Sequence, residues 1–173
     1  CAAASIDPQL FDRPDSRVPA NVMERLWRLG EQLTGDPDVG LHSAESYNPG
    51  ALSIVGYVIL SCRTAGAALD CLARYAPLLN EGLHVEFVAG ERQTVCRFSA
   101  VEAFDSFLHR EPRQVMETLA AGAVVTLRRL ATGPVEPARV TFRHAAPPSI
   151  AEHLRILGQT VHFNESEDSV IYD

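Results

Sequence analysis

The chain has 173 residues, of which 46% are hydrophobic and 21% are charged. These values predict one folded domain with a core of its own and exclude a disordered chain. The net charge of −7 argues against direct nucleic-acid binding, because phosphate recognition needs clustered Lys and Arg. All 15 basic residues are arginine, which excludes Schiff-base lysine chemistry and the lysine of a phosphate-binding loop.

The cysteines and the hydropathy pattern bear on metal content and location. None of the four cysteines, Cys1, Cys62, Cys71 and Cys96, forms a C-x-x-C pair. The last three lie in apolar segments, where cysteine behaves as a small hydrophobic residue, so we expect no zinc site and no other cofactor. We expect a reduced cytoplasmic location, with no membrane span and no signal peptide. We also expect the chain to be a piece of a longer protein, because it starts at Cys1 and stops at Asp173.

Two helices are predicted in the first part of the chain. The first opens at Val18–Asn21 and ends at the turn Gly35–Pro37, with an apolar stripe along one face. A shorter helical turn is predicted within Asp38–Ser46. Trp27 lies beside the apolar stripe, and we consider it a candidate for a dimer contact.

The stretch Asn48–Asn80 is nearly uncharged and predicts two more helices. Ala51–Leu60 carries no charge, so a helix there is expected to be buried nearly all round. The hydroxyl of Thr64 is expected to cap the next helix. In that helix apolar residues recur at a spacing of three and four, while Asp70 and Arg74 form a pair on the other face.

After residue 80 the apolar period changes from that of a helix to that of a strand. His84–Ala89 and Thr94–Ser99 flank a short Gly-containing turn and predict a β-hairpin. The remaining predicted elements are a long helix at Pro112–Ala131, a strand at Ala138–Arg143, a short helix at Ile150–Leu157 and strands at Val161–Phe163 and Val170–Tyr172. The predicted fold is therefore α+β, a single domain in which an antiparallel or mixed sheet of about five strands packs against several helices.

The order of several short motifs resembles a known family. The motifs are G-D-P at residues 35–37, N-P-G-A-L-S-I-V-G-Y-V-I-L-S at 48–61, A-A-L-D-C-L-A-R-Y at 67–75, H-A-A-P at 144–147, L-G-Q-T-V-H-F-N at 157–164 and S-V-I-Y-D at 169–173. With the hairpin and the long helix between them, they resemble the N-terminal arabinose-binding-like effector domain of AraC-type bacterial transcription regulators. Within that family the likeness is to the subgroup of ornithine-utilisation and VirS-type regulators. Pro77 and Leu157–Gly158 depart from the family pattern, so the resemblance does not imply a particular ligand.

The resemblance implies that residues 1–173 form a domain that senses a small-molecule effector and contributes to homodimer formation. In such regulators a C-terminal pair of helix-turn-helix motifs binds DNA, and we expect that part to be absent from this chain. The resemblance also implies a regulator rather than an enzyme. Glu102, Asp105 and His109 come nearest to an acid–base group, and we interpret them as exposed residues of a linker-like stretch.

We expect the effector pocket between the sheet and the helices of residues 48–80. The residues assigned to it are Tyr57, Leu60, Tyr75, Phe87, Arg97, Phe98 and Phe142. The alternative for the aromatic residues is a filled core, and the alternative for the whole domain is a dimerisation module without a pocket. The opposite sheet face is interpreted either as an anion-binding or docking surface or as a solvated face. Its predicted residues are His84, Glu86, Arg97, Arg139, Arg143 and His162.

Overall fold

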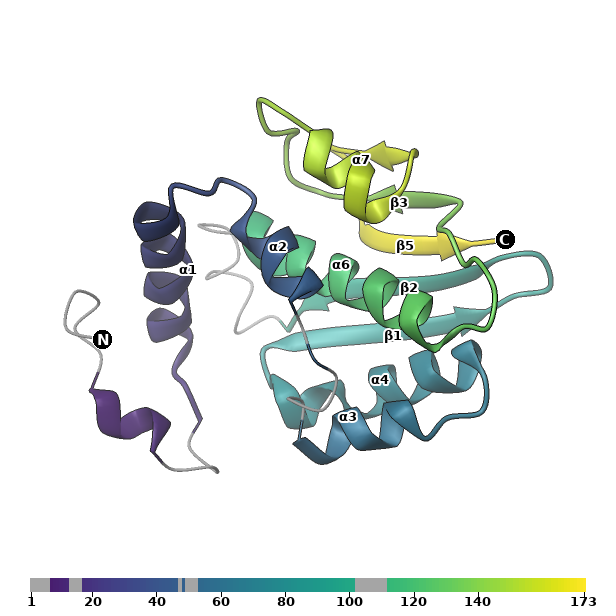
Figure 1. The fold of residues 1–173 in the computed structure, drawn as a ribbon, viewed down its shortest axis with the longest axis horizontal. Helices are drawn as coiled ribbons and strands as arrows, with labels where there is room; N and C mark the ends of the chain where they lie inside the picture. The colour runs from purple at the N-terminus through teal and green to yellow at the C-terminus, as the bar shows by residue number, and fades with distance from the viewer. Residues whose placement is uncertain (1–6, 13–16, 47, 49–52, 102–111) are drawn as a thin grey trace.

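Helices lie against one face of a five-stranded sheet in the computed structural model, which describes residues 7–12, 17–46, 48, 53–101 and 112–173 (Figure 1). The helices are α1 (Ala20–Thr34), α2 (Val39–Glu45), α3 (Ser53–Leu60), α4 (Ala65–Leu79), α6 (Pro112–Leu130) and α7 (Ala151–Leu157), with a 3-10 helix η2 at Pro8–Phe11. The strands are β1 (Leu83–Ala89), β2 (Thr94–Ala100), β3 (Arg139–Thr141), β4 (Val161–His162) and β5 (Asp168–Tyr172). The predicted α+β class is confirmed, and the predicted strand ends differ from these bounds by a residue or two. Within the described ranges, no helix combines the length and the apolar character needed to cross a membrane.

The sheet is mixed, with strand order β1-β2-β5-β3-β4. Only β3 and β4 pair in parallel, and the other neighbours are antiparallel. The register aligns one apolar residue from each strand on the face that the helices cover: Phe87, Cys96, Val170, Val140 and Val161. The neighbouring row, on the opposite face, consists of Glu86, Arg97, Ser169, Thr141 and His162. The predicted faces of the hairpin are therefore confirmed.

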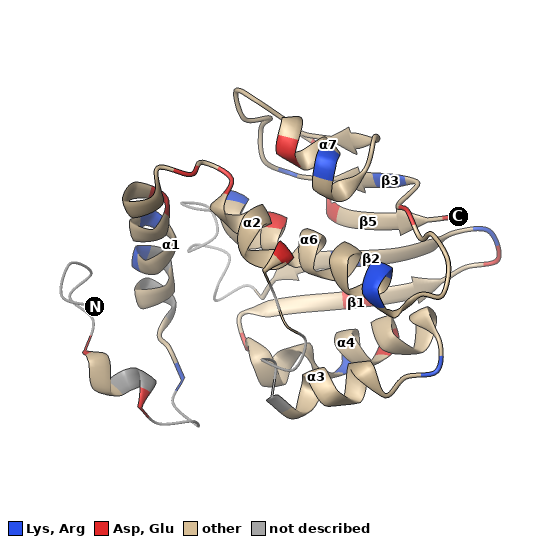
Figure 2. Cartoon of the chain, viewed as in Figure 1, with Lys and Arg blue, Asp and Glu red and all other residues tan. Residues whose placement is uncertain are grey.

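Helix α3 corrects one prediction from the sequence. Val55 and Ile59 are buried against α4, but Ile54 and Tyr57 are 66% and 64% exposed and Leu60 is 44% exposed. The helix therefore carries an apolar face toward solvent instead of being buried nearly all round. Figure 2 shows that no charged residue interrupts α3. Residues 51 and 52 of the predicted helix lie outside the described part of the chain.

Helix α4 begins and continues as the sequence indicates. The Thr64 hydroxyl accepts a hydrogen bond from the backbone N–H of Ala67 at 3.1 Å and so caps the first turn. Asp70 and Arg74 form an ion pair at 3.5 Å on the exposed side. The helix runs through Pro77 to Leu79, and it packs against both α3 and β1.

Helix α2 is held against the long helix α6 by a buried glutamine. Gln114 is 4% exposed, and its Oε1 accepts from the backbone N–H of Gly40 at 2.8 Å. Its Nε2 donates to the carbonyl of Pro37 at 2.9 Å. This docking places Asp38, just before α2, and Ala44, within α2, beside α6. Helix α1 lies next to α2 at the edge of the domain, with Trp27 half-buried against the main core (Figure 1).

Candidate functional site

A cavity of about 160 Å³ lies between α4, α6 and the hairpin, and residues of α2 and α3 complete its wall. The residues around it belong to two hydrophobic clusters. One lies between the sheet and the helices that cover it, and the other lies between α3 and α4. The lining residues are Ala44, Ile59, Ala68, Leu69, Leu72, Ala76, Leu79, Asn80, Leu83, Val85, Phe98, Thr118, Leu119, Gly122, Ala123, Thr126 and Leu127. No charged side chain is among these described lining residues, so the cavity is suited to an apolar ligand.

The few polar side chains of the lining are largely engaged elsewhere. Thr118 Oγ1 lies 2.6 Å from the carbonyl oxygen of Gln114 and 2.9 Å from that of Gly40. Asn80 Oδ1 accepts from the backbone N–H of Gly82 at 2.9 Å. An occupant of the cavity would therefore find mainly methyl and methylene groups, with hydroxyl and amide groups at a few points.

Small residues on facing helices create this space. Ala68 and Ala76 of α4 face a part of α6 that includes Gly122 and Ala123, and each of these lines the cavity. A Cβ added at Gly122 would meet no neighbouring heavy atom within 4 Å. A glycine in the middle of a helix weakens the helix, so its presence here is accounted for by the room it leaves. The sequence signal that was missed is this small-residue stretch in a long apolar helix.

Of the residues that the sequence analysis assigned to a pocket, Phe98 lines the cavity. Phe87 is half-buried in the main core, near the first turn of α4, and Tyr75 is half-buried in the cluster between α3 and α4. Tyr57 and Leu60 lie on the exposed face of α3. For these four residues outside the lining, contact with an effector stays a prediction.

The other two assigned residues lie farther along the sheet. Phe142 is fully buried and stacks on Phe163, with 5.7 Å between the ring centroids. Arg97 lies on the opposite sheet face, where it donates to Glu167 at 2.9 Å and to Glu86 at 3.1 Å. The guanidinium therefore already has two carboxylate partners, which reduces what it can offer to an anionic ligand.

The cysteines occupy two kinds of environment. Cys62 and Cys71 are half-buried with their sulfur atoms 3.5 Å apart, in the cluster between α3 and α4. Burial, with the adjacent Cys71 thiol as a second cause, raises the pKa of Cys62. Cys96 belongs to β2 and lies on the sheet face that the helices cover, where burial raises its pKa to about 12. All three are free thiols. Glu102, Asp105 and His109 lie outside the described residues.

The comparisons with known proteins decide the family. The sequence model described as "Arabinose-binding domain of AraC transcription regulator, N-term" matches residues 1–173. The chain belongs to this AraC regulator family. Its membership confirms the resemblance found in the motifs and supports a regulatory, effector-binding domain.

Two individual proteins are similar to this AraC-type domain over nearly its whole length. An "Ornithine utilization regulator" of Pseudomonas aeruginosa is 26% identical over 168 residues, which cover 94% of this chain and 47% of that protein. The crystal structure of the transcriptional regulator CdpR from Pseudomonas aeruginosa matches with a TM-score of 0.65 and 17% identity, over 99% of this chain and 51% of CdpR. At that identity the likeness to CdpR shows the fold alone. The chain spans about half the length of both relatives.

Proposed function

We propose that this AraC-type domain senses a small, predominantly apolar effector in the cavity between α4, α6 and the hairpin. The observation that carries the proposal is an uncharged cavity of about 160 Å³ in a domain of a regulator family. An apolar occupant gains free energy by leaving water, and its shape is selected by the packed walls.

The chemistry of the lining bears on the class of effector. The curated relative is named for ornithine utilisation, and ornithine carries two ammonium groups and a carboxylate. Burying such charges without charged partners is costly, and the lining offers none. We therefore propose that this chain responds to an uncharged or mostly hydrocarbon molecule, and that ornithine does not occupy this cavity.

We propose further that effector binding alters the association of two copies of the chain. Helix α4 forms one wall of the cavity and packs against α3, whose exposed face presents Ile54, Tyr57 and Leu60. An effector that favours one arrangement of α4 would favour the corresponding position of that face. In the full-length regulator, dimerisation through this domain would set the spacing of the C-terminal DNA-binding domains.

A thermal-shift series tests the sensing proposal. We expect n-octanol and indole to raise the unfolding midpoint in a concentration-dependent manner, and ornithine to leave it unchanged. A ligand at a hundredfold excess over its Kd stabilises by about 2.7 kcal/mol, which corresponds to a midpoint rise of about 5–10 °C for a domain of this size.

Matched variants locate the binding. Gly122→Leu places a side chain where a Cβ meets open space, so it should abolish the shift while the domain remains folded. Gly122→Ala adds one methyl group and should weaken binding less. Arg97→Gln, on the other sheet face, should leave the shift intact. Loss of binding in Arg97→Gln but not in Gly122→Leu would move the site to the outer face and overturn the proposal.

Sedimentation velocity tests the dimerisation part. Tyr57→Arg places a charge in the middle of the exposed α3 face and should shift the chain toward monomer. Ser99→Arg, at an exposed position of β2 on the other sheet face, serves as the charge-matched control. Trp27 is less informative, because it packs on the main core and its replacement would also disturb folding. A dimer that persists unchanged in Tyr57→Arg removes α3 from the interface.

A further inference from the structure

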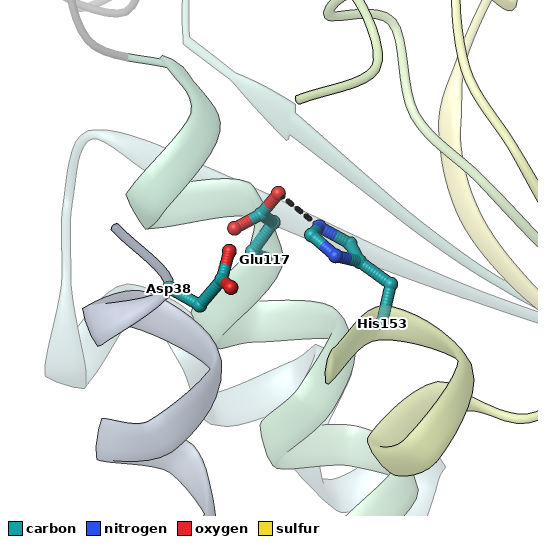
Figure 3. Close-up of side chains that lie close together, drawn as sticks. All are labelled: Asp38, Glu117 and His153. Carbon is teal, nitrogen blue, oxygen red and sulfur yellow. Dashed lines mark hydrogen bonds and ion pairs between the residues drawn. The ribbon is translucent and has the colours of Figure 1, made fainter. Parts of the chain in front are cut away.

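We propose that a buried polar cluster where α2, α6 and α7 meet is a binding site for a divalent transition-metal ion of the Zn²⁺ class. The cluster consists of Asp38, at the start of α2, Glu117 of α6 and His153 of α7 (Figure 3). One ligand atom from each lies within 4.8 Å of the others, and all three residues are buried. This site is separate from the apolar cavity, and the proposal does not depend on effector binding.

Glu117 is the centre of the cluster. Its side chain is fully buried, and its Oε1 accepts from His153 Nε2 at 2.5 Å and from Arg113 Nε at 2.9 Å. Its second oxygen, Oε2, has no hydrogen-bond partner among the residues that the structure describes. Figure 3 shows this second oxygen directed toward the carboxylate of Asp38. Two buried carboxylates that face each other, one with an unpaired oxygen, form an arrangement that a cation stabilises.

The negative charges of the cluster are not fully balanced by positive ones. Arg113 contributes one positive charge and contacts both Asp38 and Glu117, which contribute two negative charges. With neutral imidazole rings the buried sum is one negative charge. Buried charges are normally balanced by partners or by metal ions, so a further cation is expected here.

His144 approaches the same carboxylate from the loop after β3, outside the group of three residues whose ligand atoms lie within 4.8 Å of one another. Its Nδ1 lies 3.0 Å from the carbonyl oxygen of Ala145 and donates to it, which leaves a lone pair on Nε2. That Nε2 is buried 3.6 Å from Glu117 Oε1, and no described residue forms a hydrogen bond with it. A lone pair facing a carboxylate oxygen is repulsive unless a cation lies between them. A backbone carbonyl that accepts from the far ring nitrogen is also the usual support of a metal-bound histidine.

A proton on His153 is the competing occupant of the site. It would complete the charge and account for the short contact between His153 and Glu117. It would leave Glu117 Oε2 and His144 Nε2 without partners, whereas a metal ion satisfies lone pairs of this kind. His153 Nδ1 has no hydrogen-bond partner among the described residues in either case. Imidazole nitrogen and carboxylate oxygen suit Zn²⁺, with ligand atoms roughly 3.3 Å apart in a tetrahedral site. Binding would therefore open the contact between His153 and Glu117 by roughly 1 Å.

Zinc titration of the 173-residue chain, without an affinity tag and dialysed against a chelator, tests the proposal. Calorimetry should show one Zn²⁺ per chain, and free Zn²⁺ at a hundredfold excess over its Kd should raise the unfolding midpoint by about 5–10 °C. Mg²⁺ at the same concentration should have no effect, because it prefers all-oxygen octahedral sites. A wild-type chain that binds no stoichiometric Zn²⁺ would overturn the proposal.

Two variants separate this site from other parts of the chain. Glu117→Gln keeps the shape of the side chain but lowers its affinity for metal, and it should weaken Zn²⁺ binding about a hundredfold or more. Glu86→Gln, on the exposed sheet face, is the matched control and should bind like wild type. Equal binding by Glu117→Gln and wild type would overturn the proposal.

Two measurements on the wild-type chain cover the remaining alternatives. Co²⁺ in place of Zn²⁺ should give d–d absorption without a thiolate charge-transfer band; such a band would assign the metal to the Cys62–Cys71 pair and overturn the proposal. Histidine NMR signals keep the test valid if Glu117→Gln fails to fold. Zn²⁺ should move the ring signals of His144 and His153 and leave that of His84 unchanged, and movement of His84 alone would contradict the assignment.

Discussion

Gly40 lies so close to Gln114 that a Cβ added at Gly40 would stand 2.5 Å from the carbonyl oxygen of Gln114. This contact joins α2 to α6 and places Asp38 beside Glu117 and Ala44 beside the cavity. Backbone cannot move aside cheaply, so Gly40→Ala should lower the free energy of unfolding by about 1–3 kcal/mol. Denaturant titration measures this change. Gly30→Ala in α1, where the added Cβ would meet Val39 at 3.9 Å, should be neutral or slightly stabilising. Equal effects of the two substitutions would contradict the close packing.

The cap of α4 supplies a second prediction. Thr64→Ala removes the hydroxyl that accepts from the N–H of Ala67 and should lower the free energy of unfolding by about 1 kcal/mol. Thr64→Ser keeps the oxygen and should lose less than half of that. Chemical denaturation of both variants provides the comparison, and a serine variant as unstable as the alanine variant would show that the methyl group, not the cap, matters.

Stability should depend on pH through His42. Hydrogen bonds with Asp36 at 2.6 Å and with Glu152 at 2.9 Å raise the pKa of His42 above its usual value. A raised pKa contributes stability fully below the unfolded pKa of about 6.5 and loses it as pH rises through the folded pKa. Between pH 6 and pH 8.5, the wild-type unfolding midpoint should therefore fall more than that of His42→Gln.

The control for this pH dependence is His84→Gln, on the exposed face of β1, measured with a chelator present. It should keep the wild-type slope of midpoint against pH. If His42→Gln and the wild type have the same slope, the pair of carboxylates around His42 does not contribute in this range.

The thiols should differ in reactivity. Cys96 is fully buried and its pKa is raised to about 12, so iodoacetamide at pH 8 should leave it unmodified in the folded chain. Cys62 and Cys71 are partly accessible and should react more rapidly than Cys96. Peptide mass spectrometry distinguishes the sites, and urea-unfolded chain should label all of them. Labelling of Cys96 at the rate of Cys71 would contradict its burial.

Periodicity in the sequence was sufficient for the elements and the sheet faces. Thr64, the Asp70–Arg74 pair and the hairpin turn are local features, so each could be read from residues close together in the chain. The exposure of helix α3 could not be predicted in this way. An uncharged segment predicts burial, but no local pattern shows that only the Val55 side would be covered and that the Tyr57 side would face solvent.

The cavity and the polar cluster depend on contacts between distant parts of the chain. Glu117 and His153 are 36 residues apart and meet only because α6 and α7 pack together. The signal that was available is Glu117, the one charged residue between Arg113 and Arg128 on a helix that is mostly apolar. Gly122 gave a similar hint about the cavity. Neither residue shows in the sequence which other residues it meets, because side-chain spacing along the chain does not determine which helices face each other.

We propose that an apolar effector binds between α4, α6 and the hairpin. Methyl NMR of the leucine and valine side chains during titration with n-octanol tests it most directly. We expect saturable shifts at Leu69, Leu72 and Val85, which line the cavity, and none at Val88 or Val95 on the other sheet face. Shifts confined to Val88 and Val95, or to the exposed methyl groups of α3, would contradict it.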